Sequence, residues 1–284
     1  MENFAGLMPA FSDYNQSKIV ILPVPYDTTS TWVKGADKGP DALLEASVAL
    51  EWYDIETKTQ VYLHGINTAP PVTGKTKPEL LCDEVESRLL KIISDKKFPV
   101  IIGGNHTVSI GAFRVMAKAY QDLTILQLDA HSDLRKTYEG SALNHACVMH
   151  RAKELCPITQ VGIRSMCDEE TYYYDQNRIF FAHEMLEDKT WQRKALKTLN
   201  KNVYITIDLD VFDPGIMPST GTPEPGGLGY YEALYFLRAV IESRNVVGFD
   251  VVELCPNENN KAPDFLAARF IYQLLTYQFK KGSV

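Results

Sequence analysis

Short apolar runs that alternate with longer amphipathic segments constrain the fold of this chain more than any other feature. Such runs cover residues 18–23, 98–102, 123–128, 203–207 and 246–252, and each has the length of a strand. Strands that are apolar on both faces and separated by helices are typical of a parallel sheet covered on both sides. With right-handed crossovers, the pattern predicts a three-layer α/β/α fold around a central parallel sheet.

Longer segments with apolar residues at helical spacing lie between these runs. The clearest covers residues 78–96, where Leu81, Val85 and Leu89 share one helical face. No stretch rich in Pro, Gly and Ser, no block of like charges and no internal repeat divides the chain, so we expect a single domain over residues 1–284. The other expected elements are short strands at residues 158–162 and 178–181 and helices at residues 39–50, 106–119, 144–155, 191–200, 230–243 and 263–279.

Charge and hydropathy exclude two classes of protein. The formal net charge is −7, and the Lys and Arg residues are scattered without a basic run, which argues against nucleic-acid binding. No apolar run approaches the ~20 residues that span a bilayer, so we expect no membrane segment. The acidic balance fits a small cationic partner.

The cysteines and the first residues of the chain indicate its compartment. The five cysteines are odd in number and contain no CxxC pair, which argues against a disulfide framework and a thiolate zinc site. A reducing compartment is the simplest explanation. Residues 1–10 lack the basic start and apolar segment of a secretory signal. We therefore expect a cytoplasmic protein.

Four polar clusters follow directly after expected strands. They are GGNHT at residues 103–107, DAHSD at residues 129–133, DLDVFD at residues 208–213, and Glu253. In parallel α/β sheets, ligands bind outside the carboxyl ends of the strands. The four clusters are therefore expected to meet at one edge of the sheet.

The second and third clusters carry several carboxylates. In extended chain alternate residues share a face, so Asp129, His131 and Asp133 can point the same way, as can Asp208 and Asp210. Carboxylates this close repel one another unless a cation neutralises them. Carboxylates with imidazoles suit Mn²⁺, and this many carboxylates fit two ions ~3.5–4 Å apart better than one.

Each cluster alone has an ordinary structural explanation. Asp and His are common in loops, and Asp208 and Asp210 could cap a helix or form a turn. Three separate strand ends carry such groups in one chain, however, and their joint occurrence favours a metal centre. The candidate metal ligands are His106, Asp129, His131, Asp133, Asp208 and Asp210.

These motifs resemble those of the arginase/agmatinase ureohydrolases, most closely the agmatinases, nearly from end to end. The resemblance implies an arginase-like fold and a hydrolase with two Mn²⁺ ions per chain that releases urea from a small cationic guanidino substrate. It also implies a homotrimer or homohexamer. The matching segments are PVPYD at residues 23–27, KGADKGP at 34–40, GGNHT, DAHSD, DLDVFDPGIMPSTGTPEPGG at 208–227, and DVVE at 250–253.

The resemblance also implies a role for each candidate ligand. Asp129 and Asp208 would bridge the two ions, and a hydroxide between the ions would attack the guanidinium carbon. Asp133 would also hydrogen-bond that hydroxide and aim it. The remaining ligands would be His106 and Asp133 for one ion and His131 and Asp210 for the other.

Two further residues match family positions that handle the substrate. Glu253 matches the carboxylate that binds the guanidinium, a planar donor group that pairs naturally with a carboxylate. His145 matches a loop histidine that contacts the substrate and passes a proton to the leaving amine. By itself, His145 would be explained equally well by capping or packing.

The chain departs from the family at one position beside a ligand. The family commonly has an acid where this chain has Asn105, and an amide supplies no negative charge, which puts the preferred metal in question. The neighbouring Gly103 and Gly104 are not a phosphate loop, because no Lys-Ser/Thr follows them. We expect them to permit the tight turn that brings His106 to the metal.

The expected reaction is hydrolysis of agmatine to putrescine and urea, a step of polyamine biosynthesis. Glu224 lies in a segment, TPEPGG, that looks like the agmatinase version, and an acid at the site mouth would repel the carboxylate of arginine. Glu224 could instead only brace its loop. The same chemistry on aminopropylagmatine, guanidinobutyrate or arginine stays open. So does a non-catalytic relative that keeps the fold for subunit assembly, although the full ligand set argues against it.

Overall fold

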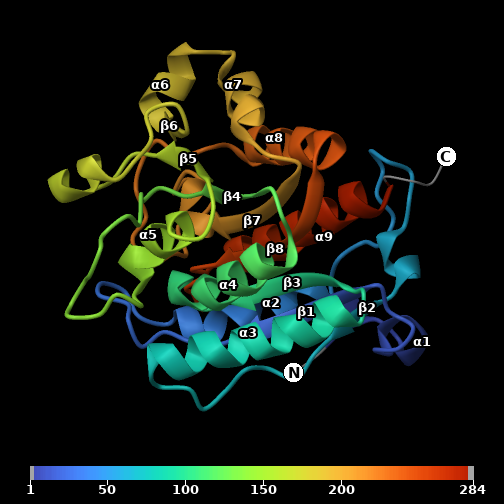
Figure 1. The fold of residues 1–284 in the computed structure, drawn as a ribbon. Helices are drawn as coiled ribbons and strands as arrows, with labels where there is room; N and C mark the ends of the chain where they lie inside the picture. Colours follow the sequence, from blue (N-terminus) through green and yellow to red (C-terminus); the bar gives the residue numbers. More distant parts are fainter. Residues whose placement is uncertain (1–2, 281–284) are drawn as a thin grey trace.

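Eight strands form one parallel sheet through the middle of the molecule (Figure 1). The structure is a computed structural model, and it describes residues 3–280. The strand order is β2-β1-β3-β8-β7-β4-β5-β6. The strands are β1 (Ile19–Val24), β2 (Ile66–Thr68), β3 (Phe98–Gly103), β4 (Leu123–Leu128), β5 (Ile158–Ile163), β6 (Ile179–Phe181), β7 (Asn202–Asp208) and β8 (Asn245–Val252).

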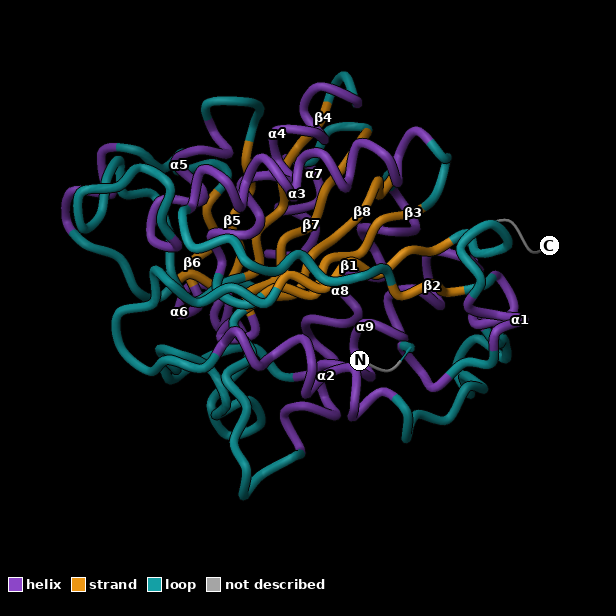
Figure 2. The backbone as a smooth tube through the Cα atoms, turned by 90° about the horizontal axis from the view of Figure 1, so that it is seen from below, coloured by secondary structure: helices purple, strands orange, loops and turns teal. Residues whose placement is uncertain are grey.

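Helices cover both faces of the sheet, as Figure 2 shows for α3 and α4 on one side and α2 and α9 on the other. Alternate residues of each strand feed two cores: Ile19 and Ile21 of β1 pack on the α2/α8/α9 side, and Val20 and Leu22 pack on the α3/α4/α5 side. The predicted three-layer α/β/α fold is confirmed. The helices are α1 (Pro9–Ser12), α2 (Gly39–Ser47), α3 (Pro78–Ser94), α4 (Ser109–Ala119), α5 (Val148–Lys153), α6 (Ala182–Glu187), α7 (Trp191–Thr198), α8 (Tyr230–Ser243) and α9 (Ala262–Lys280).

Three short elements were not expected from the sequence: α1, β2 and α6. They have 4, 3 and 6 residues, which is too short for a hydrophobic period to show. The helices expected at residues 106–119 and 144–155 each begin instead with a separate turn of 3-10 helix, η4 (His106–Val108) and η5 (His145–Cys147). No helix within residues 3–280 has both the length and the apolar character needed to cross a bilayer.

The strand order brings four carboxyl ends together at the centre of the sheet. After β3 the chain crosses to β4, and the gap between them is later filled by β7 and β8. The register then sets Ile102, Val251, Ile207 and Leu128 side by side across β3, β8, β7 and β4. Because these four residues are level, the polar residues that follow each strand emerge at one place.

Candidate metal centre and active site

The strand ends lead into tight turns rather than further extended chain. Asp208 is the N-cap of the 3-10 helix η7 (Leu209–Val211), and its Oδ1 accepts the backbone N–H of Asp210 at 2.9 Å. Asp133 has a left-handed backbone with φ of 52°. The expectation that extended chain with alternating side chains places these residues was therefore wrong. Local caps and a turn determine where their side chains point. The capping explanation holds for Asp208, which also faces the acidic cluster described next.

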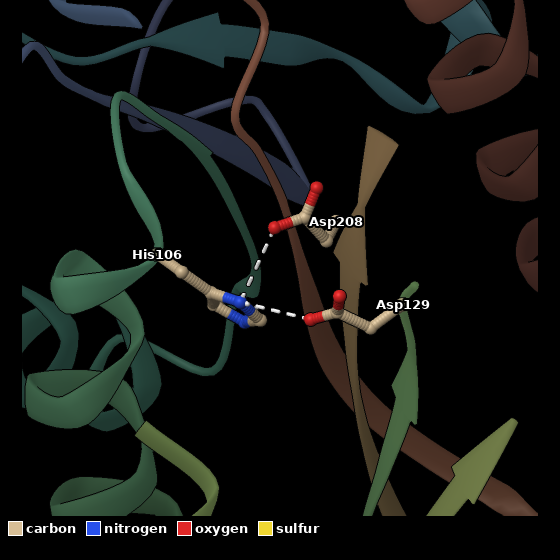
Figure 3. Close-up of side chains that lie close together, drawn as sticks. All are labelled: His106, Asp129 and Asp208. Atoms are coloured by element: carbon tan, nitrogen blue, oxygen red, sulfur yellow. Dashed lines mark ion pairs between the residues drawn. The ribbon is translucent and has the colours of Figure 1, made fainter. Parts of the chain in front are cut away.

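The first cluster gathers three carboxylates around one imidazole. The Nδ1 atom of His106 lies 3.2 Å from Oδ2 of Asp129, 3.1 Å from Oδ2 of Asp133 and 3.4 Å from Oδ2 of Asp208. Figure 3 shows His106, Asp129 and Asp208 pointing toward one another from the ends of β3, β4 and β7. All four side chains are buried. His106, Asp129 and Asp208 have ligand atoms close enough to share one metal ion.

The second cluster shares Asp129 with the first. The Nδ1 atom of His131 lies 2.8 Å from Oδ2 of Asp210 and 3.8 Å from Oδ1 of Asp129. Asp129 therefore presents one carboxylate oxygen to each imidazole, as a bridging ligand does. Asp129, His131 and Asp210 form a second group that could hold a metal ion.

The hydrogen bonds of His106 leave one ring nitrogen free to bind a metal. Its Nε2 lies 2.8 Å from Oγ1 of Thr206, and that hydroxyl donates to Oδ1 of the buried Asp250 at 2.6 Å. Because the hydroxyl proton goes to Asp250, Nε2 is the donor, and in the neutral ring that binds a metal Nδ1 carries the lone pair. Nδ1 is buried without a hydrogen-bond partner and faces only carboxylates. A lone pair among carboxylates fits a cation.

The electrostatics of the cluster call for positive charge. Burial and then the neighbouring Asp210 and Asp133 raise the pKa of Asp129 to about 7. Burial lowers the pKa of His106, but the close carboxylates of Asp129, Asp133 and Asp208 outweigh it and hold that pKa well above its ordinary value. Burial and Asp210 also raise the pKa of Asp208. Without a cation these groups therefore retain protons, which a bound metal would replace.

Glu253 lies beside the first cluster, and its two carboxylate oxygens have different surroundings. Its Oε1 accepts the backbone N–H of His106 at 2.7 Å, and its backbone φ is 66°. Its Oε2 is 3.8 Å from the position of a Cβ added to Gly221, in the wall of a cavity of about 300 Å³. Burial raises the pKa of Glu253 to about 8. The cavity is lined by Trp32, Asp133, His145, Asp208, Thr222 and Glu253, among others.

Gly104 fixes how closely the β3 turn approaches its neighbours. A Cβ at this position would lie 2.1 Å from the carbonyl oxygen of Tyr26, while the Gly104 carbonyl accepts the N–H of Glu253 at 2.8 Å. Neither Gly103 nor Gly104 has a left-handed φ. Glycine is therefore needed here for close backbone contact, and the expected turn conformation was not the reason.

Comparison with known proteins identifies the family. The sequence model described as the arginase family matches residues 17–276. The chain belongs to the arginase family. An N(1)-aminopropylagmatine ureohydrolase of Synechocystis sp. is 40% identical over 279 residues, covering 94% of this chain and 91% of the relative. An agmatinase of Halalkalibacterium halodurans is 35% identical over 275 residues, covering 93% of each chain.

A solved structure agrees with this arginase-family assignment. The agmatine ureohydrolase of Thermoplasma volcanium superposes with a TM-score of 0.90 at 29% identity, covering 99% of this chain and 97% of that one. The prediction of an arginase-like fold and of an arginase-family ureohydrolase is confirmed at the level of the family.

His145, the histidine that the sequence resemblance pointed to, lies in the wall of the same cavity. Asn144 caps η5 by accepting the N–H of Ala146 at 3.1 Å, which makes His145 the first residue of that turn. The Nδ1 atom of His145 is buried without a hydrogen-bond partner. Burial lowers the pKa of His145, so the imidazole is neutral at pH 7.

Glu224 lies beside a metal-cluster histidine at the edge of the site. Its Oε1 is 3.9 Å from Nε2 of His131, and its side chain is 38% exposed. The backbone oxygen of Glu224 accepts from Nη2 of Arg164 at 2.9 Å, which anchors the loop. Glu224 can therefore act on a substrate tail only through a partly solvated contact.

Asn105, in the turn after β3, connects that turn to the loop at the cavity mouth. Its Nδ2 donates to Oγ1 of Thr29 at 2.7 Å and to Oγ of Ser30 at 3.2 Å. Two residues further on, Trp32 stands 76% exposed in the cavity wall. An acid at position 105 could not donate these hydrogen bonds. The amide at position 105 therefore holds the loop at the cavity mouth in place.

Proposed function

We propose that the chain is a binuclear manganese ureohydrolase that acts on agmatine or on N(1)-aminopropylagmatine. The observation that carries the proposal is the pair of imidazole–carboxylate clusters sharing Asp129, with the free oxygen of Glu253 in the cavity beside them. The names of the relatives support both substrates. The 40% identity to an aminopropylagmatine ureohydrolase is the reason to keep aminopropylagmatine as a candidate beside agmatine.

The donor set fits two hard to borderline divalent ions. When bound, the ions supply charge neutralisation and acidify a water molecule so that it is nucleophilic near neutral pH. The carboxylate of Asp133 would accept a hydrogen bond from the attacking water and fix its direction. The residues that would hold the ions are His106, Asp129, His131, Asp133, Asp208 and Asp210.

Glu253 would bind the guanidinium group of the substrate, and His145 would transfer a proton to the leaving amine. Oε2 of Glu253 accepts two N–H groups of the planar guanidinium and so turns its carbon toward the attacking water. Water adds to that carbon, the bond to the tail nitrogen breaks, and the two protons of the water end on the tail nitrogen, which leaves as an ammonium group. His145 would carry one of these protons, because the residue lines the cavity and its Nδ1 has no hydrogen-bond partner within the protein.

The charge of the cavity favours a cationic tail. The bound ions would neutralise the ligands Asp133, Asp208 and Asp210, which leaves the carboxylates of Glu253 and Glu170 in the lining. Arg135, the arginine that residues 3–280 contribute to this wall, is already engaged. The Arg135 guanidinium carbon lies 4.5 Å from the Tyr138 ring centroid, and its Nε lies 3.8 Å from Oε2 of the buried Glu170. A tail carboxylate, as in arginine or guanidinobutyrate, would add to this negative charge and would find no free Lys or Arg among the described residues of the lining.

The test is the kcat/KM for agmatine, aminopropylagmatine, guanidinobutyrate and arginine under one Mn²⁺ condition. We expect one of the two amine-tailed substrates to rank first and arginine to rank last. Arginine in first place would overturn the substrate assignment and leave the metal chemistry intact. A protein that binds two Mn²⁺ ions per chain and releases urea from none of the four would be the non-catalytic relative.

Glu224→Gln measures the contribution of Glu224 to this ranking. Because the side chain is more than a third exposed, solvent screens its repulsion of a tail carboxylate to about 1 kcal/mol or less, or up to about fivefold in the agmatine/arginine ratio. An unchanged ratio would mean that Glu224 only braces its loop and orients His131.

Oligomer, compartment and pathway belong to the same proposal. We expect a single domain that assembles as a homotrimer or homohexamer, in the cytoplasm, and supplies putrescine or a longer polyamine. The family resemblance supports these expectations. Light scattering on a size-exclusion column would check the assembly.

A further inference from the structure

Four buried polar side chains form a row across the sheet, directly below the metal cluster. The register pairs Gln160 of β5 with Gln127 of β4, Gln127 with Thr206 of β7, and Thr206 with Asp250 of β8. Their exposed fractions are 2%, 0%, 0% and 0%. Gln127 and Thr206 precede Asp129 and Asp208 by two residues, so along β4 and β7 they lie on the same face as those ligands. Polar groups this deep persist only when hydrogen-bonded.

Both N–H groups of the Gln127 amide donate to the segment that contains Asp129 and His131. Its Nε2 donates to Oδ2 of Asp129 at 2.7 Å and to the backbone oxygen of His131 at 3.1 Å. The other oxygen of Asp129 accepts the backbone N–H of His131 at 2.6 Å. Each oxygen of the shared carboxylate is thus held by one donor while facing one imidazole.

Gln160 decides which end of the Gln127 amide faces Asp129. Its Nε2 donates to Oε1 of Gln127 at 2.6 Å and to the backbone oxygen of Ser132 at 2.8 Å. If the Gln127 amide were reversed, its oxygen would face the Asp129 carboxylate and its N–H groups would face those of Gln160. Both contacts would be repulsive. The pair therefore works as a unit with one favourable orientation.

We propose that Gln127 and Gln160 are positioning residues for the metal centre and hold Asp129 in its bridging orientation. This inference rests on the proposed function, since it requires that the cluster binds metal. Neither glutamine touches the cavity or the substrate. They act only through Asp129, so their first effect is on metal affinity.

The experiment measures Mn²⁺ binding to metal-depleted protein by isothermal titration calorimetry. The variants are Gln127→Leu, Gln160→Leu and the double variant. We expect each single change to weaken Mn²⁺ binding by about 10- to 100-fold. The double variant should be little worse than either single one, because the amides act together. At saturating Mn²⁺, kcat should recover toward the wild-type value and the KM for substrate should stay unchanged.

Thr124→Val is the matched control. Thr124 is a fully buried polar residue at the other end of β4, and its hydroxyl accepts the N–H of Asn200 at 3.0 Å. Its loss should lower the melting temperature as a buried polar change does, while leaving Mn²⁺ affinity unchanged. A Gln160→Leu variant that loses stability like this control and retains wild-type affinity would contradict the inference.

Gln160→Glu keeps the shape of the side chain and covers the case in which the leucine variants do not fold. A carboxylate at this position attracts the N–H groups of Gln127 and so reverses its amide. We expect it to weaken Mn²⁺ binding at least as much as leucine does. If folded Gln160→Glu binds Mn²⁺ with wild-type affinity, the positioning role is wrong. The proposed function still stands in that case, provided that the wild type binds two Mn²⁺ ions per chain. A wild type that binds no Mn²⁺ would overturn both.

Discussion

The floor of the site and its mouth are built in different ways. The floor consists of side chains at the ends of four neighbouring strands, and His106, Asp129 and Asp208 are at most 4% exposed. The mouth consists of loops, where Trp32 is 76% exposed and the Glu224 side chain 38% exposed. Buried contacts act at low dielectric and tolerate little change, whereas solvated contacts are weak and exchangeable. We therefore expect the floor to set the reaction that arginase-family enzymes share, and the mouth to set which substrate is accepted.

Asp129→Ala is the largest expected disruption, because it removes the one side chain that both clusters share. We expect urea release to fall below detection and bound manganese to be lost from both positions. The change also leaves one N–H of the Gln127 amide without its carboxylate acceptor. Elemental analysis after dialysis measures the metal. Full retention of two ions per chain would contradict the bridging assignment.

Asp188→Ala is the control for this loss. Asp188 is a surface carboxylate next to α6 that pairs with Lys194 at 2.7 Å. It shares the substitution but lies outside the site. Its manganese content and turnover should match those of the wild type.

His145→Ala disrupts the mouth and should spare the floor. If the imidazole carries the proton to the leaving amine, kcat should fall by about 10²–10⁴-fold with manganese content unchanged. His183→Ala, at an exposed position on α6, is the matched control and should have no effect. An unchanged kcat in His145→Ala would remove this residue from the mechanism.

The sequence predicted the floor better than the mouth, for a physical reason. Asp129 and Asp208 follow apolar strands directly, and parallel strands bring their carboxyl ends together regardless of loop detail. The local geometry at those ends was not predicted, because the left-handed backbone of Asp133 and the cap at Asp208 are single-residue features without a hydrophobic period. Periodicity reports which face is buried and says little about single turns.

The residues that support the floor were missed, although the sequence contained a signal for them. Gln127 is a polar residue in the otherwise apolar end of its strand, ILQL, two positions before a ligand, and Thr206 stands likewise in ITID. A polar residue on the buried face of a strand must have a partner. Asp250 and Gln160 could be linked to them only through the sheet register, which requires the strand order.

The smallest expected effect is on how the stability of the metal-free protein depends on pH. The floor and the mouth contribute to this dependence with opposite signs. Asp129 and Glu253 have pKa values raised to about 7 and about 8, and His131 to about 11, so the folded apoprotein binds more protons than the unfolded chain. Raised pKa values mean stability that is lost as pH rises through them. His145 has a lowered pKa and the opposite sign, with its window below pH 6.5.

Between pH 7 and 9 the floor loses stability as pH rises, and the buried Cys82 and Cys147, whose pKa values burial raises, add to the loss toward pH 9. The melting temperature of chelator-treated protein should therefore fall as pH rises. Each extra proton held contributes about 1.4 kcal/mol per pH unit, or about 2 °C or more in a chain of this size. Saturating Mn²⁺ replaces these protons and should flatten the dependence. Asp208→Asn removes a repelling carboxylate, so it should raise the apoprotein melting temperature at pH 9 and reduce the gain from Mn²⁺. An apoprotein that becomes more stable from pH 7 to 9 would mean that the cluster holds no protons for a metal to replace.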